Sequence, residues 1–260
     1  MTAILTVSDL EKTFGSVVAA RDISVSVPVG QTVGIIGSNG AGKTTFVNMI
    51  TGHLKPSKGA IHFEGKEITG LPSRAITRRG ISRSFQVAQV FPTLTVLENM
   101  RIAAAIAKGR DSIVGQMFQW LDAPETAAES DAALELFQIA RYRDARAATL
   151  PQGVRKLLDI AMAVAGAPRL LLLDEPTSGI SIEEKYGLME VVMSALKVRK
   201  ITVLFVEHDM DIVGRFADRV LAFYDGTVIA DETPETVLSN PKVQTLISGT
   251  QRDHLGAAHA

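Results

Sequence analysis

The stretch "GSNGAGKTT", from Gly37 to Thr45, decides the fold because its first eight residues fit the pattern G-x-x-x-x-G-K-[ST]. The apolar run "TVGIIG" (32–37) comes before it and predicts a buried strand, and "GKTTFVNMITG" (42–52) predicts the helix that follows. A strand, a glycine-rich loop and a helix are the setting that this pattern requires. The alternative, a glycine-rich turn without a ligand, leaves that setting unexplained.

The residue types in this loop suit the binding of phosphate. Glycines let successive backbone N–H groups point at phosphate oxygens, and the first turn of the helix presents its positive end to them. We expect Lys43 to reach the β- and γ-phosphates and the hydroxyl of Thr44 to bind Mg²⁺. The predicted nucleotide-binding residues are Gly37, Ser38, Asn39, Gly40, Ala41, Gly42, Lys43, Thr44 and Thr45.

A second strand end carries two carboxylates. Four leucines (170–173) lead directly into Asp174 and Glu175. An acid at the end of such a strand predicts a ligand of Mg²⁺, and the next carboxylate predicts a general base that polarises the attacking water. The alternative is that both side chains cap the following loop.

The rest of the chain alternates strands and helices. "AILTVSDL" and "ISVSVPVG" predict two strands, with "EKTFG" as the turn between them, and "GAIHFEGKEIT" predicts a strand, a turn and a strand end. Helical spacing dominates from about residue 92 to 148, as in "TVLENMRIAAAIAK" and "AALELFQIARY". Alternation then returns with "RLLLLDE", "ITVLFVEHD" and "RVLAFYDGTVIA". This order predicts an α/β fold whose parallel sheet is covered by helices.

Composition excludes several classes of protein. The chain has 260 residues, 46% of them hydrophobic and 21% charged, with a formal net charge of −1 and no cysteine. There is accordingly no overall attraction to nucleic acid, no disulfide and no thiolate metal site. We see neither a secretory signal nor an apolar run of about 18–20 residues that would span a bilayer. The densest basic stretch, "SRAITRRGISR" (73–83), is interpreted as a solvated face.

Five motifs together resemble the ATP-binding cassette (ABC) ATPases. They are "GSNGAGKTT", "RSFQ", "LPQGV", "LLLLDEPTSG" and "VEHD", in the order of that family, and the resemblance extends from Leu5 to about Gly249. The chain is most similar to the ATPase subunits of branched-chain amino acid importers. The features that indicate this type are "RSFQ" followed by "VFPTLTVLENM", the extra segment around residues 108–130, and "VEHDM".

The resemblance implies a RecA-like P-loop NTPase core with an N-terminal antiparallel β subdomain and an inserted helical subdomain. Residues 1–250 then form a single ABC ATPase domain. The core and β subdomain take about 1–91 and 156–250, and the helical subdomain takes about 92–155. A short helix and loops are expected between the two helical segments, and the tail 251–260 is expected to be poorly ordered.

The resemblance also assigns roles to single residues. Phe14 falls where an aromatic ring stacks on adenine, although a phenylalanine in the core is the alternative. Gln86 matches the glutamine that contacts Mg²⁺ or water and senses the membrane partner, whereas the nearby Gln89 lacks the preceding phenylalanine. His208 matches the histidine that faces the γ-phosphate.

The stretch "LPQGV" (150–154) departs from the family's signature turn, L-S-G-G-Q, which binds the ATP held by a partner ATPase. Leu150 and Gly153 match and are expected to contact that ATP, whereas Pro151 removes a hydroxyl and a backbone N–H. Ser181 also stands where the family usually has aspartate. We hypothesise an asymmetric heterodimer in which this chain's own ATP is hydrolysed and the partner's ATP turns over more slowly. A homodimer is the alternative.

The implied function is Mg²⁺-dependent ATP hydrolysis that drives the import of a small solute. The implied partners are transmembrane permease subunits, a second ATPase subunit and, indirectly, a solute-binding protein, at the cytoplasmic face of the membrane. "VAQVFPTLTVLENM" is expected to line a groove for a helix of the permease, or simply to begin the helical subdomain. The alternatives are an ABC exporter or lipid-extraction ATPase, a soluble ABC protein acting on ribosomes or DNA, and a P-loop kinase.

Overall fold

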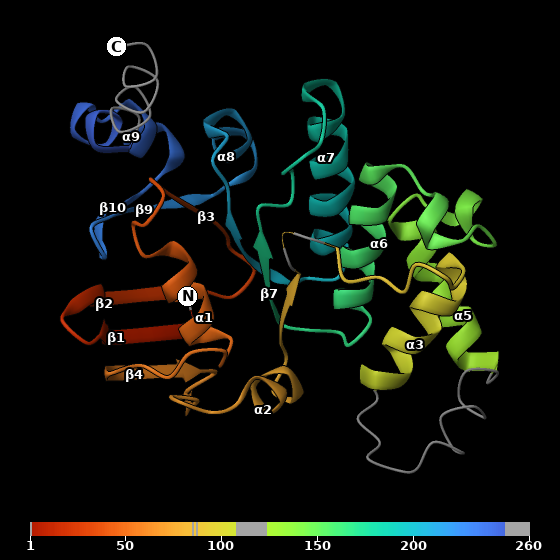
Figure 1. Cartoon of the computed structure of the whole chain (residues 1–260), viewed down its shortest axis with the longest axis horizontal. Coiled ribbons are helices and arrows are strands. Elements are labelled where there is room, and N and C mark those ends of the chain that lie inside the picture. The colour runs from red at the N-terminus through yellow and green to blue at the C-terminus, as the bar shows by residue number, and fades with distance from the viewer. Residues whose placement is uncertain (1, 85, 87, 108–123, 248–260) are drawn as a thin grey trace. The chain divides into compact units, whose positions relative to one another are not determined.

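The computed structural model describes residues 2–84, 86, 88–107 and 124–247 (Figure 1). These residues form two compact units, the first made of Met1–Ile76 and Thr202–Ala260 and the second of Thr77–Ile201. The expectations for the extra segment before residue 124 and for the C-terminal tail lie outside the described residues.

The first unit contains an antiparallel sheet in the order β2-β1-β4-β5. Its strands are β1 (Ala3–Phe14), β2 (Val17–Pro28), β4 (Lys58–Phe63) and β5 (Lys66–Glu67). Buried aliphatic residues alternate with exposed ones along β1 and β2, as a sheet with one buried face requires. The predicted antiparallel β part is therefore present.

The first unit also contains a mainly parallel group of strands in the order β10-β9-β3-β8. β3 pairs in parallel with β8 and β9, and β10 is antiparallel to β9. The bounds are β3 (Thr32–Gly37), β8 (Thr202–Val206), β9 (Arg219–Tyr224) and β10 (Thr227–Glu232). All five residues of β8 are buried, which explains why they read as a continuous run of β-branched and apolar side chains.

Short helices connect or follow the strands of the first unit. They are α1 (Lys43–Ile50), α2 (Ser73–Arg78), which leads into the second unit, α8 (Met210–Phe216) and α9 (Pro234–Ser239). α8 begins after Asp209, whose carboxylate accepts hydrogen bonds from the backbone N–H groups of Asp211 and Ile212. This side-chain cap stabilises the helix start directly after the predicted histidine.

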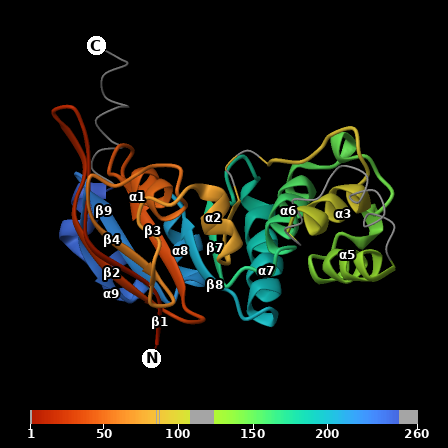
Figure 2. The same ribbon diagram turned by 90° about the horizontal axis from the view of Figure 1, so that it is seen from below.

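The second unit combines two parallel strands with a group of helices (Figure 2). α3 packs against α5 and α6, and α6 packs against α7 and β6. The bounds are β6 (Ile81–Ser84), β7 (Leu170–Asp174), α3 (Val96–Ala107), α5 (Pro124–Leu136), α6 (Gln152–Val164) and α7 (Ile182–Val198). Two short 3-10 helices lie at Ala140–Tyr142 and Ala147–Thr149.

Two boundaries differ from the prediction. β1 continues to Phe14, so "EKTF" is strand and the turn is centred on Gly15, with φ +59°. The strand persists because Lys12 and Phe14 still pair with β2, opposite Ala20 and Val17. The helix predicted through "AALELFQIARY" ends at Leu136, and Gln138 takes a φ of +57°, which is incompatible with a continuing α-helix.

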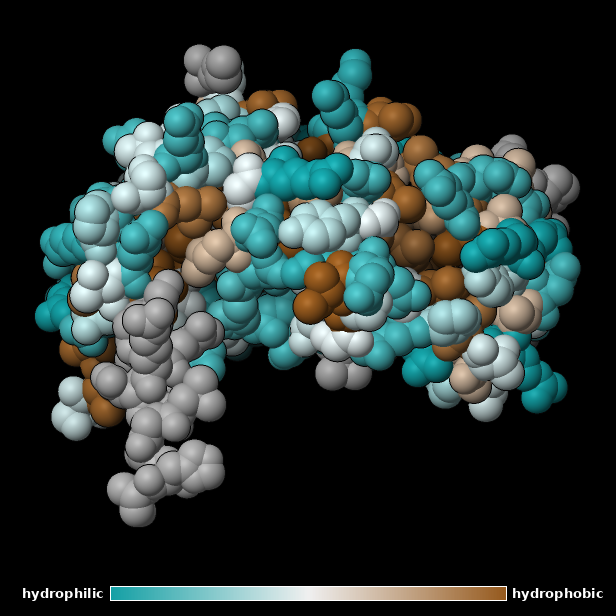
Figure 3. All heavy atoms as spheres, turned by 90° about the horizontal axis from the view of Figure 1, so that it is seen from above, coloured by the Kyte–Doolittle hydropathy of each residue, from teal (hydrophilic) through white to brown (hydrophobic). Residues whose placement is uncertain are grey.

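The predicted limits of the helical subdomain, about 92–155, do not coincide with the two compact units and stay a prediction. On the face drawn in Figure 3 most side chains are hydrophilic, with apolar areas between them. Among the described residues, no helix has both the length and the apolar character needed to cross a membrane.

Candidate functional site

The phosphate loop depends on glycines at two of its positions. Gly37 and Gly42 have φ values of +154° and +98°. A Cβ atom would lie 2.5 Å from the backbone oxygen of Phe223 at the first position, and 2.7 Å from that of Ala19 at the second. Neither distance is possible without moving backbone. The loop can therefore take this path only with glycine at both positions.

Lys43 is held inside the loop. Its side chain starts at the first residue of α1, the residue is only 6% exposed, and Nζ donates hydrogen bonds to the carbonyl oxygens of Gly37 (2.6 Å) and Ser38 (2.9 Å). The next residue, Thr44, is exposed. An ammonium group enclosed by a glycine loop at a helix N-terminus is an environment suited to a phosphate anion.

Phe14 is a surface residue. It is 52% exposed at the end of β1, and the ammonium nitrogen of Lys12 lies 5.0 Å from its ring centroid. The adjacent Val17 and Val18 are also exposed, at 62% and 45%. The alternative that Phe14 belongs to the core is therefore wrong, and its stacking on adenine stays a prediction.

His208 follows β8 at the same edge of the sheet as the phosphate loop. β8 is the parallel neighbour of β3, and its last residue, Val206, is opposite Ile35, so His208 and Gly37 each lie two residues beyond this pair. The backbone N–H of His208 donates to the carboxylate of the buried Glu207 (3.2 Å), and the histidine itself is exposed. The first unit thus brings His208 to the strand end where the phosphate loop begins.

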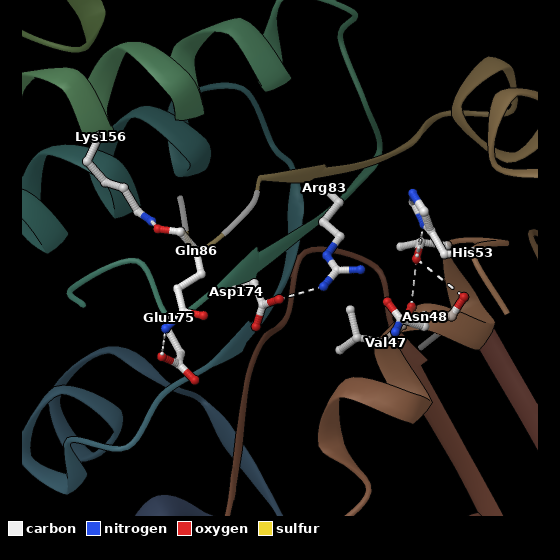
Figure 4. A network of polar contacts seen from close by, with 9 residues as sticks. Val47, Asn48, His53, Arg83, Gln86, Lys156, Asp174 and Glu175 are labelled. Atoms are coloured by element: carbon white, nitrogen blue, oxygen red, sulfur yellow. Dashed lines mark hydrogen bonds and ion pairs between the residues drawn. The ribbon is translucent and has the colours of Figure 1, made fainter. Parts of the chain in front are cut away.

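The second unit pairs Asp174 with a buried cation. At the end of β7 its carboxylate Oδ2 lies 2.5 Å from Nη2 of Arg83 on the neighbouring β6, with side-chain exposures of 16% and 8% (Figure 4). The interpretation of "SRAITRRGISR" as a solvated face is wrong for its last residue. Arg83 lies on β6, which does not include the other arginines of this stretch, and its side chain is 8% exposed.

Glu175 and Gln86 meet at the same strand ends. Because Ser84 of β6 is opposite Leu173 of β7, both residues lie two positions beyond a paired position. Nε2 of Gln86 donates to Oε2 of Glu175 at 2.7 Å and lies 3.5 Å from the hydroxyl of Ser178. Glu175 has a φ of +48°, a conformation uncommon for residues other than glycine and frequent at functional sites.

Two further residues of the second unit hold this region and were missed by the sequence analysis. Nζ of Lys156 donates to the main-chain oxygen of Gln86 at 2.6 Å, and Oδ1 of Asp159 accepts from the backbone N–H of Gln89 at 2.7 Å. Both belong to α6. Their sequence signal is that both are charged residues, three positions apart, and that they lie among the apolar residues of this helix.

The signature turn leads into α6. Leu150 is buried, and Pro151 occupies the N-cap position, where no side chain accepts a hydrogen bond from the helix. Nε2 of Gln152 lies over Gly179, where a Cβ atom would come within 2.4 Å of it. A Cβ on Gly153 would meet only a methyl group of Leu188, at 4.0 Å. No packing within the described chain therefore requires glycine at position 153.

The donor groups fit a magnesium ion. The predicted ligands offer a carboxylate (Asp174), an amide (Gln86) and a hydroxyl (Thr44), which are the hard oxygen donors that Mg²⁺ prefers. In the described part of the chain no three acidic or histidine side chains gather as a metal cluster. Mg²⁺ at a nucleotide site needs only one or two protein ligands, because phosphates and water complete its shell.

The glycine loop that encloses Lys43 between β3 and α1 is the arrangement of a P-loop nucleotide-binding protein. The sequence profile of the family "ABC transporter" matches residues 20–178. The chain belongs to this ABC transporter family. Its fold is the predicted α/β fold with a RecA-like P-loop core.

Named relatives and solved structures are consistent with this family assignment. The chain is 35% identical, over 92% of its length and 95% of the relative's, to the high-affinity branched-chain amino acid transport ATP-binding protein BraF of Pseudomonas aeruginosa. It is equally identical, over 95% and 96%, to the probable transport ATP-binding protein LivG of Archaeoglobus fulgidus. The ADP conformation of an ATP-binding cassette of an ABC transporter matches with a TM-score of 0.82 and 33% identity, covering 95% of this chain and 98% of that one.

Proposed function

We propose that this chain is the ATP-binding and ATP-hydrolysing subunit of an ABC importer for a small solute, such as a branched-chain amino acid or a related amide or organic acid. The observation that carries the proposal is the glycine loop that encloses Lys43, in a chain 35% identical to BraF over 92% of its length. The described residues supply a nucleotide site and no membrane-spanning helix, so the solute would be bound by other subunits.

The chain's residues support phosphoryl transfer to water. Glu175 is the general base, and the amide of Gln86, 2.7 Å from it, orients the carboxylate toward the attacking water. Backbone N–H groups of the loop and Lys43 stabilise the charge that develops on the transferred phosphoryl group. His208 contributes a further donor toward the γ-phosphate.

Mg²⁺ would be held by Thr44, Asp174 and Gln86, and when bound it would neutralise charge on the β- and γ-phosphates. The guanidinium of Arg83 forms an ion pair with Asp174, so a positive charge lies beside this proposed metal ligand.

The proposed partners are transmembrane permease subunits, a second ATPase subunit and, indirectly, a solute-binding protein, with this chain attached to the cytoplasmic face of the membrane. The turn before α3 offers a firm surface for a permease helix. The fully buried Asn99 bonds the backbone N–H of Phe91 (2.7 Å) and the carbonyl oxygens of Phe91 (3.1 Å) and Thr95 (2.9 Å), while Phe91 itself is 44% exposed.

The second ATPase subunit is proposed to be a different chain. Pro151 leaves the N-cap of α6 without the hydroxyl of the usual signature, and Gln152 packs over Gly179 instead of leaving the turn open. Each hydrogen bond lost to a charged phosphate weakens the contact by about 1.5–3 kcal/mol. At its own ATP site, this chain retains the family's residues in the phosphate loop and at Glu175 and His208. ATP bound here is therefore expected to turn over faster than ATP bound to the partner.

The test uses the Glu175→Gln variant, which blocks hydrolysis and preserves the closed dimer where one forms. Its mass is measured by light scattering with and without ATP and Mg²⁺, and ATP binding is measured in parallel. We expect a monomer that binds ATP. A dimer that appears only with ATP would overturn the asymmetric pairing, because two "LPQGV" turns would then suffice. Failure to bind ATP would overturn the function itself.

A further inference from the structure

α6 is tied at two points to the segment that follows β6. Lys156 and Asp159 are three positions apart and so share one face of the helix. Both are buried, at 4% and 5% exposure. Lys156 binds the carbonyl oxygen of Gln86, and Asp159 binds the backbone N–H of Gln89 (2.6 and 2.7 Å). Charged side chains are rarely buried unless they are paired, so these contacts account for their presence.

The residue held by Lys156 also reaches Glu175. The main-chain oxygen of Gln86 accepts from Lys156, while its side-chain Nε2 donates to Glu175 at 2.7 Å (Figure 4). A continuous series of hydrogen bonds therefore runs from α6 through Gln86 to Glu175. Because Gln86 is itself exposed, packing alone does little to fix its position.

We propose that Lys156 and Asp159 are positioning residues for ATP hydrolysis, acting through Gln86. By holding the main chain at Gln86 and Gln89 they aim the Gln86 amide at Glu175, and they make the orientation of the base depend on the position of α6. Since α6 begins in the signature turn, a partner's nucleotide bound at that turn would influence hydrolysis in this same chain. The inference rests on the proposed function.

The kinetic test compares Lys156→Met, Asp159→Ala and Gln86→Ala with the full-length chain, in single-turnover hydrolysis of ATP with protein in excess. A misplaced catalytic group costs up to about a hundredfold in rate. Lys156→Met should lower the rate of hydrolysis about ten- to a hundredfold and leave ATP affinity within about twofold, because the phosphate loop is untouched. Asp159→Ala should act in the same direction from the other attachment point.

Two comparisons separate positioning from a general structural effect. In the Gln86→Ala background Lys156→Met should change the rate by less than about twofold, since the residue through which it acts is already gone. Lys156→Arg keeps the charge and a donor, so it should retain more activity than Lys156→Met. The matched control is Lys197→Met, which removes an exposed lysine from α7 and should change nothing.

A second readout does not depend on turnover. Hydrogen exchange of the backbone N–H of Gln89 should become faster in Asp159→Ala and Lys156→Met, with the melting temperature recorded for each variant, and should stay unchanged in Lys197→Met. An equal loss of rate with and without Gln86, or unchanged exchange at Gln89, would overturn the inference. If the parent chain hydrolyses ATP normally in such a case, the proposed function stands and the inference alone fails.

Discussion

Arg83 and Asp174 form a nearly buried ion pair, and removing one partner leaves the other charge uncompensated. We expect Arg83→Met to lower the free energy of unfolding by about 3 kcal/mol in the absence of nucleotide, because breaking such a pair costs far more than the intact pair contributes. Urea unfolding monitored by circular dichroism measures the change.

The matched control for this pair is the double variant Arg83→Met, Asp174→Asn. Replacing both charges leaves no isolated ion, so much of the lost stability should return, although the variant should lose its response to Mg²⁺. A single Arg83→Met variant as stable as the parent chain would contradict the role assigned to the pair.

Glycine at position 153 stabilises α6 less than alanine would and leaves the backbone there without a side chain. Glycine within a helix is less stable than alanine by up to about 1 kcal/mol, and a Cβ at this position has room within the chain. Gly153→Ala should therefore raise the melting temperature by a few degrees and, in the assembled transporter, slow hydrolysis of the partner's ATP. Calorimetry and the ATPase rate of the complex measure the two effects, and a gain of stability with full activity would exclude a ligand at this turn.

At the scale of elements, α3 starts with a reciprocal cap. The backbone N–H of Thr95 donates to Oε2 of Glu98 at 2.7 Å, its hydroxyl donates to the same oxygen at 3.0 Å, and the Glu98 N–H donates back to Oγ1 at 3.2 Å. Such a capping box satisfies N–H groups that the first helical turn leaves without partners. The start of α3 and the Phe91 turn before it are therefore fixed locally.

Thr95→Ala should lower the free energy of unfolding by about 1 kcal/mol through the loss of this cap. The hydrogen bonds from Thr95 also lower the pKa of the Glu98 carboxyl, the backbone one most strongly. The contribution of Glu98 is therefore present above the ordinary glutamate pKa and is lost as the pH falls through the lower folded-state pKa. Unfolding curves between neutral and acidic pH should show this loss in the parent chain, and Glu98→Gln should lack it.

Local patterns predicted most elements, and pairing between distant segments accounts for what was missed. The phosphate loop, α1 and β7 follow from motifs and periodicity in their own residues. The continuation of β1 to Phe14 depends on its pairing with β2, which the polar "EKTF" does not reveal. Likewise, Arg83 is distinguished from the neighbouring arginines only by the strand pairing that brings it to Asp174. The role of Lys156 could not be predicted, because it depends on the contact between α6 and Gln86, which are far apart in the sequence.

At the scale of the whole molecule, the predicted site residues are distributed over both compact units. The phosphate loop, Phe14 and His208 belong to the first unit, whereas Asp174, Glu175, Gln86 and the signature turn belong to the second. A chain built from separate compact units need not unfold in a single transition. The size of the thermal shift caused by nucleotide binding can therefore show whether the whole chain or the first unit alone unfolds in the shifted transition.

ATP with Mg²⁺ at a hundred times its dissociation constant should stabilise the folded chain by about 2.7 kcal/mol. With an unfolding entropy of about 2.1 cal/mol/K per residue, the calorimetric transition should rise by about 5 °C if the whole chain unfolds together, and by about 10 °C if the first unit unfolds alone. Lys43→Met, which removes the ammonium group enclosed by the loop, should abolish most of the shift in either case. No shift in the parent chain would contradict a nucleotide site at the glycine loop, and an equal shift in Lys43→Met would place the nucleotide elsewhere.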